Sequence, residues 1–244
     1  MDAVCAEPAI DALCRQSNAV SLTVASVNAD VYVGHPGVRG IMYIEGDNRP
    51  EGFDRIITVP AGLSDASAGE RILHAADVLG VQLDRTSPRI YLTSMDTIRT
   101  QRLELGHTGQ PIAALCFRQE TDGDSDSWRR WTSICDALQE QWNASIILLA
   151  GTGGALRVHK NLVGRLMPRE AAAVLSRCTV WLGDDPVYAA LGAAVQIPGV
   201  FISERPVFQE EQMIETCPAF ASDTEILEAL NRVRRERKTL NVSS

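Results

Sequence analysis

The sequence predicts an α/β protein built from parallel sheets, in two Rossmann-like units of which the N-terminal one is reduced. Continuous apolar runs recur along the chain and indicate strands that are buried on both faces of a sheet. Segments with helical periodicity separate these runs, as expected where crossover helices join parallel strands. The chain has 244 residues, 45% of them hydrophobic, so it is long enough for two small domains with cores of their own.

The first part of the chain contains short strand-like runs and one clear helix. Three strands are predicted at 21–25, 41–44 and 55–59. Apolar residues three and four positions apart predict a helix over 66–79, and Gly80 is a favourable residue at its C-terminal end. The polar segment 93–110 follows and is predicted to be partly helical, so we place the end of the first unit within it.

The second part repeats the alternation of strands and helices more strongly. Strands are predicted at 112–117, 145–150, 179–182 and 199–203, and helices at 128–142, 168–177 and 187–195. A last helix begins after Ser222 and has Glu225 at the capping-box position. The resulting division is an N-terminal domain over 1–106, a C-terminal domain over 107–221, and a C-terminal helix and tail over 222–244.

The charge balance of the chain is acidic, with a net charge of −8 and a pI of about 5.1. This balance argues against a protein that binds nucleic acid or an anionic membrane over a broad surface. An anionic ligand would be bound locally, by a few Arg, Lys or backbone N–H groups. No stretch reaches the ~18–20 apolar residues of a membrane span, and the first twenty residues lack the basic start of a signal peptide.

The six cysteines and four histidines suggest no metal centre. The cysteines are far apart and show no CxxC spacing, and two of them, Cys116 and Cys178, lie in or beside apolar runs. We therefore expect reduced cysteines packed in the core, in a reducing compartment such as the cytoplasm. The histidines are scattered along the sequence and form no evident ligand pair or triad.

Loops after the predicted strands carry the candidate binding residues, because ligands of doubly wound sheets bind at the carboxyl ends of strands. Gly151 and Gly153 belong to the sequence GTGG, which lacks the GxGxxG spacing and fits a sharp turn better than a phosphate cradle. Asp184 and Asp185 precede Pro186. This pattern is typical of a helix N-terminus, and the acids could equally accept hydrogen bonds from a sugar hydroxyl.

Several motifs occur in an order that is found in a known family. WRRW (128–131) is followed by SIILLAGTGG (145–154) and by NLVGRLMPREAAAVLSRCTVWLGDDPVYAALGAAVQIP (161–198). Near the N-terminus, Asp2 precedes Pro8-Ala9-Ile10 at the spacing seen in that family. Over nearly its whole length, the chain resembles glycosyltransferase family 9, the ADP-heptose:lipopolysaccharide heptosyltransferases.

The resemblance implies a GT-B fold, with a nucleotide-sugar donor on the C-terminal domain and the acceptor on the N-terminal one. It implies metal-independent, inverting transfer in the cytoplasm, without a cofactor, from an ADP-heptose-like donor to a glycan or lipid-linked acceptor of lipopolysaccharide biosynthesis. By position, Asp2 matches the catalytic base, Arg129 the lysine that contacts the diphosphate, and Asp185 the aspartate of the donor motif. The donor-binding residues assigned in this way are Arg129, Arg130, Gly151, Gly153, Asp184 and Asp185.

The same alignment contains departures that support other functions. Pro186 and Val187 stand where the family has Ser-Gly, and Ala190 stands where it has His. One alternative is therefore a catalytically degenerate relative that acts as a binding or partner subunit. Another is an unrelated Rossmann-like binding module, supported by GTGG alone. The N-terminal unit lacks the family's first strand, and the sheet edge this leaves could be covered by a second copy or a partner chain.

Overall fold

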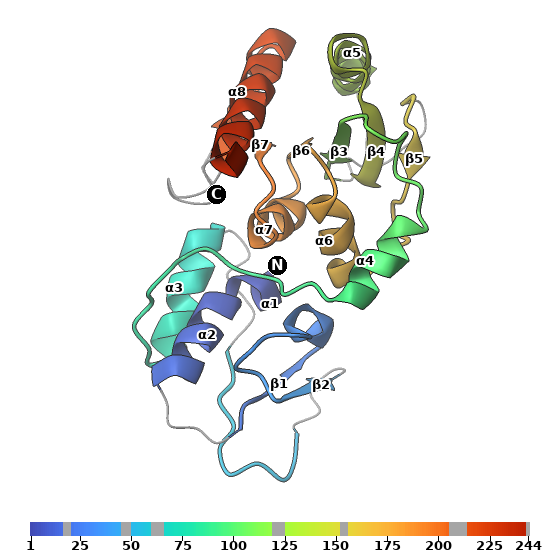
Figure 1. Cartoon of the computed structure of the whole chain (residues 1–244). Coiled ribbons are helices and arrows are strands. Elements are labelled where there is room, and N and C mark those ends of the chain that lie inside the picture. Colours follow the sequence, from blue (N-terminus) through green and yellow to red (C-terminus); the bar gives the residue numbers. More distant parts are fainter. Residues whose placement is uncertain are drawn as a thin grey trace.

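The computed structural model describes residues 1–16, 21–44, 50–59, 66–118, 125–151, 156–204 and 214–242, and of these 125–128 and 236–242 by their backbone alone. Within these ranges the protein has a mixed α/β fold with two parallel sheets (Figure 1). A two-stranded sheet lies in the N-terminal part and a six-stranded sheet in the C-terminal part. The predicted fold class is therefore confirmed.

The six-stranded sheet forms the core of the C-terminal part. Its strands are β3 (Ile112–Cys116), β4 (Ser145–Ala150), β5 (Lys160–Asn161), β6 (Val180–Gly183), β7 (Gly199–Ile202) and β8 (Ile214–Cys217). They lie in the order β5-β4-β3-β6-β7-β8, and every neighbouring pair is parallel. The first strand, β3, lies in the middle of the sheet. The chain then runs through β4 to β5 at one edge, returns to β6 on the other side of β3, and continues through β7 to β8 at the opposite edge. This is the Rossmann strand order, and its switch point lies between β3 and β6.

Helices cover both faces of this sheet, as its continuous apolar strands require. The helices are α5 (Ser125–Trp142) and α8 (Asp223–Val242) on one face, and α6 (Pro168–Ser176) and α7 (Pro186–Ala194) on the other. Successive residues of β3 point to opposite sides, so that Leu115 packs with α5 and α8 while Ala114 packs with α6 and α7. The sheet is thus the middle layer of three.

Trp181 on β6 packs closely against one glycine of α7 and one of β7. Its indole is fully buried, and its Nε1 donates to the carbonyl oxygen of Ile197 at 3.2 Å. A Cβ on Gly192 or Gly199 would lie 2.5 or 2.2 Å from the indole nitrogen. These two positions therefore require glycine, because any side chain would displace the indole.

The N-terminal part is smaller and mostly helical. Its elements are α1 (Asp2–Cys5), α2 (Glu7–Gln16), β1 (Thr23–Ser26), the 3₁₀ helix η1 (Ala29–Tyr32), β2 (Gly40–Tyr43), α3 (Ala68–Leu79) and α4 (Ser94–Gln101). β1 and β2 are parallel, and α2 packs against α3. α1 contacts α7, while η1 and α4 contact α6. The N-terminal part therefore sits over the α6–α7 layer of the large sheet (Figure 1).

Most predicted elements are found close to their expected ends. β4 occupies the predicted range, Gly80 ends α3 with a φ of 65°, and Ser222 and Glu225 form the predicted capping box at the start of α8. The division of the chain after residues 106 and 221 stays a prediction. Among the described residues, no helix combines the length and the apolar composition that a membrane span requires.

Three strands differ from the sequence analysis. The predicted strand at 55–59 is wrong, because this stretch is largely exposed and pairs with no strand in the described chain. β5 and β8 were not predicted. β5 has only two residues, and β8 is a half-buried edge strand with two polar residues in its middle instead of an apolar run.

Candidate functional site

The carboxyl ends of β3 and β6 meet at the switch point of the large sheet. The carbonyl oxygen of Cys116, the last residue of β3, accepts hydrogen bonds from the backbone N–H groups of Asp184 (3.1 Å) and Asp185 (3.2 Å). A Cβ on Gly183 would lie 1.8 Å from the same oxygen. Glycine is therefore required at this position. The two hydrogen bonds hold the backbone of Asp184 and Asp185 beside the end of β3.

Arg118 joins Asp184 across the switch point. Its backbone N–H donates to Asp184 Oδ1 at 2.7 Å, while the residue as a whole is exposed. Burial raises the pKa of the Asp184 carboxyl, and the hydrogen bond from Arg118 and its positive charge oppose that rise. Burial also raises the pKa of Asp185, again against the charge of Arg118. Two half-buried carboxyl groups and one arginine thus share this edge of the sheet.

Asp185 also begins α7. Its carboxylate accepts a hydrogen bond from the Val187 N–H at 2.8 Å, and Pro186 occupies the first helical position. The predicted helix N-terminus is therefore confirmed, and one N–H group of its first turn is bound by the protein's own carboxylate. The Tyr188 hydroxyl donates to the carbonyl oxygen of Leu149 at 2.9 Å, which ties α7 to β4.

Other residues predicted for the donor site lie beyond β4 and on α5. Gly151 has a φ of 112°, and a Cβ added to it would lie 3.2 Å from the Cβ of Phe117. The backbone conformation of Gly151 fits the sharp turn predicted for GTGG. Gly153 lies outside the described residues. Arg129 is exposed on α5, where it lines a depression of about 640 Å³.

Arg130 makes structural contacts. Its guanidinium donates to the carbonyl oxygens of Ala219 (2.7 Å) and Ala221, and its Nε lies 3.6 Å from Asp223 Oδ1. These contacts hold the turn before α8 against α5. The structure therefore ties Arg130 to the segment that follows β8.

Asp2, the predicted base, begins α1 in the N-terminal part. Its Oδ1 is bound by the guanidinium of Arg71 on α3, and the Nε of Arg71 donates to the carbonyl oxygen of Ala66 at 3.1 Å. The Asp2 side chain is 48% exposed. α1, which carries Asp2, packs against α7, whose N-cap is Asp185. The fold therefore brings these two helices together, although their sequences are far apart.

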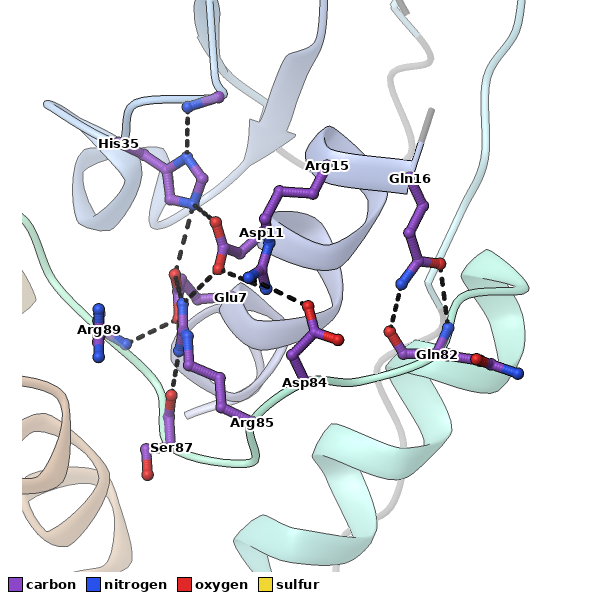
Figure 2. Close-up of polar contacts among 11 residues, drawn as sticks. Glu7, Asp11, Arg15, Gln16, His35, Gln82, Asp84, Arg85, Ser87 and Arg89 are labelled. Carbon is purple, nitrogen blue, oxygen red and sulfur yellow. Dashed lines mark hydrogen bonds and ion pairs between the residues drawn. The ribbon is translucent and has the colours of Figure 1, made fainter. Parts of the chain in front are cut away.

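A second polar cluster lies inside the N-terminal part (Figure 2). Glu7 and Asp11 are one turn apart on α2, and both face His35, whose Nε2 is 3.3 Å from Glu7 Oε1 and 3.9 Å from Asp11 Oδ1. One potential ligand atom from each residue lies within 4.8 Å of the other two. Folding therefore brings His35 to two acids that are distant from it in the sequence, a grouping that the sequence pattern alone does not reveal.

The contacts of this cluster fit an ion-pair network better than a metal site. The Nη2 of Arg85 lies 2.6 Å from Glu7 Oε1 and 3.0 Å from Asp11 Oδ2 (Figure 2). The Gly37 N–H donates to His35 Nδ1 at 3.1 Å, and from this bond we assign the proton of the neutral ring to Nε2. A metal would need a bare nitrogen at that position. Arg85 already supplies the positive charge that the carboxylates require, so we assign the cluster a structural role.

Two arginines near the predicted site were missed by the sequence analysis. Arg118 is the first charged residue after the predicted strand 112–117, so the rule that ligands bind at strand ends could have found it. Arg71 carried no such signal, because its ion pair with Asp2 joins positions 69 residues apart.

Comparisons with known proteins show which solved structures share this fold. No family model matches the sequence, and no curated protein matches it. The fold is that of GT-B-like glycosyltransferases of family 9, so the resemblance seen in the motifs is confirmed for the fold. A family 9 glycosyltransferase from Veillonella parvula superposes with a TM-score of 0.77 and 10% identity, over 96% of this chain and 94% of that one.

Two proteins of Escherichia coli share the fold. Heptosyltransferase WaaC, solved with ADP, has a TM-score of 0.56 and 11% identity, over 95% of this chain and 93% of that one. The iron-containing dodecameric glycosyltransferase TibC of an enterotoxigenic strain has a TM-score of 0.58 and 13% identity, over 96% of this chain and 73% of that one. These likenesses concern the fold alone.

Proposed function

We propose that this chain is a glycosyltransferase that moves a sugar from a nucleotide-diphosphate donor to a hydroxyl group of an acceptor. The observation that carries the proposal is the position of Asp184 and Asp185 at the switch point between β3 and β6. Nucleotide ligands of Rossmann-like sheets bind at this switch point. The fold shared with family 9 glycosyltransferases, one of them solved with ADP, supports the same class of ligand.

The finer proposal concerns the substrates. The donor is of the ADP-heptose type, and the acceptor is a glycan or lipid-linked glycan of the lipopolysaccharide type. The reaction takes place in the cytoplasm and needs neither a metal nor a cofactor. Asp2 removes the proton of the acceptor hydroxyl, whose oxygen attacks the anomeric carbon. The bond from that carbon to the diphosphate oxygen breaks, the nucleoside diphosphate leaves with the electron pair, and the anomeric configuration inverts.

Each remaining residue has a role in this proposal. Asp184 and Asp185 accept hydrogen bonds from sugar hydroxyls of the donor. Arg129 contacts the diphosphate, and Gly151 and Gly153 let the backbone approach the ligand closely. Arg130 acts indirectly, since its contacts hold the turn before α8.

A second candidate function is binding without turnover, as a catalytically degenerate relative or partner subunit. Ala190 favours it, because this residue is fully buried on α7 at the position of the family's His and offers no polar side chain. The Val187 N–H group also favours it. This group donates to the Asp185 carboxylate, so it does not offer a free hydrogen-bond donor to the donor diphosphate.

Binding and turnover distinguish the two candidates. The full chain is titrated calorimetrically with ADP, UDP and GDP, and is then incubated with ADP-heptose and a lipopolysaccharide core acceptor. We expect micromolar ADP binding, and ADP release only when the acceptor is present. ADP binding without release supports the second candidate. No binding of any of the three nucleotides contradicts the transferase and leaves only the partner-subunit form of the second candidate.

The Asp2→Asn variant tests the proposed base. It should abolish ADP release and leave the ADP affinity within about two-fold of the wild type, because the base acts on the acceptor. Asp84→Asn is the matched control, since Asp84 is an exposed, arginine-paired acid of the same part of the chain. It should change neither quantity.

A further inference from the structure

Arg118 stands at the switch point and was not among the residues assigned from the sequence. It follows β3 directly, and the residue is exposed. Its neighbours across the sheet are the carboxyl ends of β4 and β6, which pair with β3 on its two sides.

The backbone that carries Arg118 is fixed on both of these sides. The Phe117 N–H donates to the carbonyl oxygen of Ala150 at 3.2 Å, which ties the segment to β4. The Arg118 N–H donates to Asp184 Oδ1 at 2.7 Å, which ties it to the segment after β6. Because this backbone is already restrained, Arg118 loses less conformational entropy when it binds a ligand than an arginine on a free loop would lose.

A phosphate at this edge needs donors that the protein has not already used. A helix N-terminus is the common source of such donors in Rossmann-like folds. Here the first turn of α7 carries Pro186, which has no N–H, and Val187, whose N–H is bound by the Asp185 carboxylate. The α7 N-terminus is therefore partly closed to an anion, and the charge must come from a side chain.

We propose that the Arg118 guanidinium binds the diphosphate of the nucleotide-sugar donor and places it beside Asp184 and Asp185. This inference rests on the proposed function. A guanidinium has five N–H donors in a planar fork, so Arg118 can face the carboxylates and still donate to phosphate oxygens. Its positive charge also offsets the two acids, which would otherwise repel the diphosphate.

The test is calorimetric titration of the full chain with ADP and with inorganic pyrophosphate. Arg118→Ala should weaken the binding of each probe by about ten-fold or more, as expected for loss of a charge-assisted hydrogen bond. Arg118→Lys should recover part of the loss, because it restores the charge without the fork. Arg232→Ala is the matched control. This exposed arginine pairs with Glu215 between α8 and β8, and its removal should leave both affinities within about two-fold.

The outcomes separate this inference from the proposed function. If the wild type binds ADP and Arg118→Ala binds it equally well, the diphosphate lies elsewhere and the inference is wrong, while the proposed function stands. If the wild type binds none of ADP, UDP, GDP and pyrophosphate at millimolar concentration, the proposed function fails and the inference with it. Thermal unfolding of each variant shows whether a lost affinity reflects a lost fold.

Discussion

The guanidinium of Arg169 and the carboxylate of Asp96 form a two-pronged ion pair in the interior, with Nη2 2.7 Å from Oδ2 and Nε 3.1 Å from Oδ1. Their side chains are only 7% and 9% exposed. The same guanidinium donates to the carbonyl oxygens of Asp30, Val33 and Tyr91. One side chain of α6 therefore holds α4, η1 and the segment between α3 and α4 in a single arrangement.

Arg169→Met should destabilise the protein strongly. The substitution leaves the Asp96 carboxylate buried without its partner, and breaking a buried pair in this way costs about 3–5 kcal/mol. Urea unfolding measures the change in the free energy of unfolding. Arg232→Met removes an exposed pair and should cost no more than about 1 kcal/mol. A loss for Arg169→Met as small as that of Arg232→Met would contradict the role given to Arg169.

Asp96 should make stability depend on acid pH. Burial raises the pKa of its carboxyl, but hydrogen bonds from Arg169 and Thr93 outweigh burial and lower it from 3.8 to about 2. The folded-state pKa is therefore below the unfolded one, so the ionised group stabilises the fold above about pH 4 and this contribution is lost as the pH falls toward about 2. Melting temperatures over this range should fall more steeply for the wild type than for Asp96→Asn. Parallel curves would show that Asp96 contributes nothing.

Gly183→Ala should disrupt the switch point. The added Cβ would lie 1.8 Å from the Cys116 carbonyl oxygen, so β3 and β6 would have to separate, at a cost of about 2–3 kcal/mol. ADP binding should be lost with the geometry of Asp184 and Asp185. Gly69→Ala is the control, because its Cβ would lie in open space on α3, with Ser67 Oγ 3.9 Å away. That change should stabilise the helix by about 0.5–1 kcal/mol, as measured by thermal unfolding.

The cysteines should differ sharply in reactivity. Burial raises the pKa of Cys5 and of Cys135 to about 12. It also raises the pKa of Cys14, but this side chain is only half-buried and is therefore more accessible. The thiolate is the reactive form, so iodoacetamide at about pH 8 should modify Cys14 first and reach Cys5 and Cys135 only after unfolding in urea. Peptide mass spectrometry gives the order. Equal labelling of Cys14 and Cys135 in the native protein would contradict the burial described.

Local signals in the sequence predicted most of the fold. The run SIILLA is apolar after its first residue because β4 is covered on both faces, and Ser222 with Glu225 marks a helix start through hydrogen bonds between near neighbours. The strand predicted at 55–59 is wrong because its β-branched residues have strand propensity but find no partner strand. Such propensity yields a strand only where a partner strand and a buried face exist. Edge strands such as β8 carry too little apolar pattern to be recognised.

The candidate site was predictable only where it follows strand ends or the family motif. Asp184 and Asp185 were found because they follow β6 and precede Pro186. The contacts of Arg118 with Asp184 and of Arg71 with Asp2 each span more than sixty residues. No periodicity or short motif encodes such pairs, because they depend on strand order and on the packing of α1 against α3 and α7.

Binding of a nucleoside diphosphate at the switch point between β3 and β6 is tested most directly by an NMR titration of the ¹⁵N-labelled chain with ADP, followed at assigned backbone amides. We expect the signals of Arg118, Asp185 and Val187 to move in a saturable way, while those of Gly37 and His35 in the buried cluster of the N-terminal part stay in place. Saturable shifts confined to other segments, or no shifts at millimolar ADP, would contradict it.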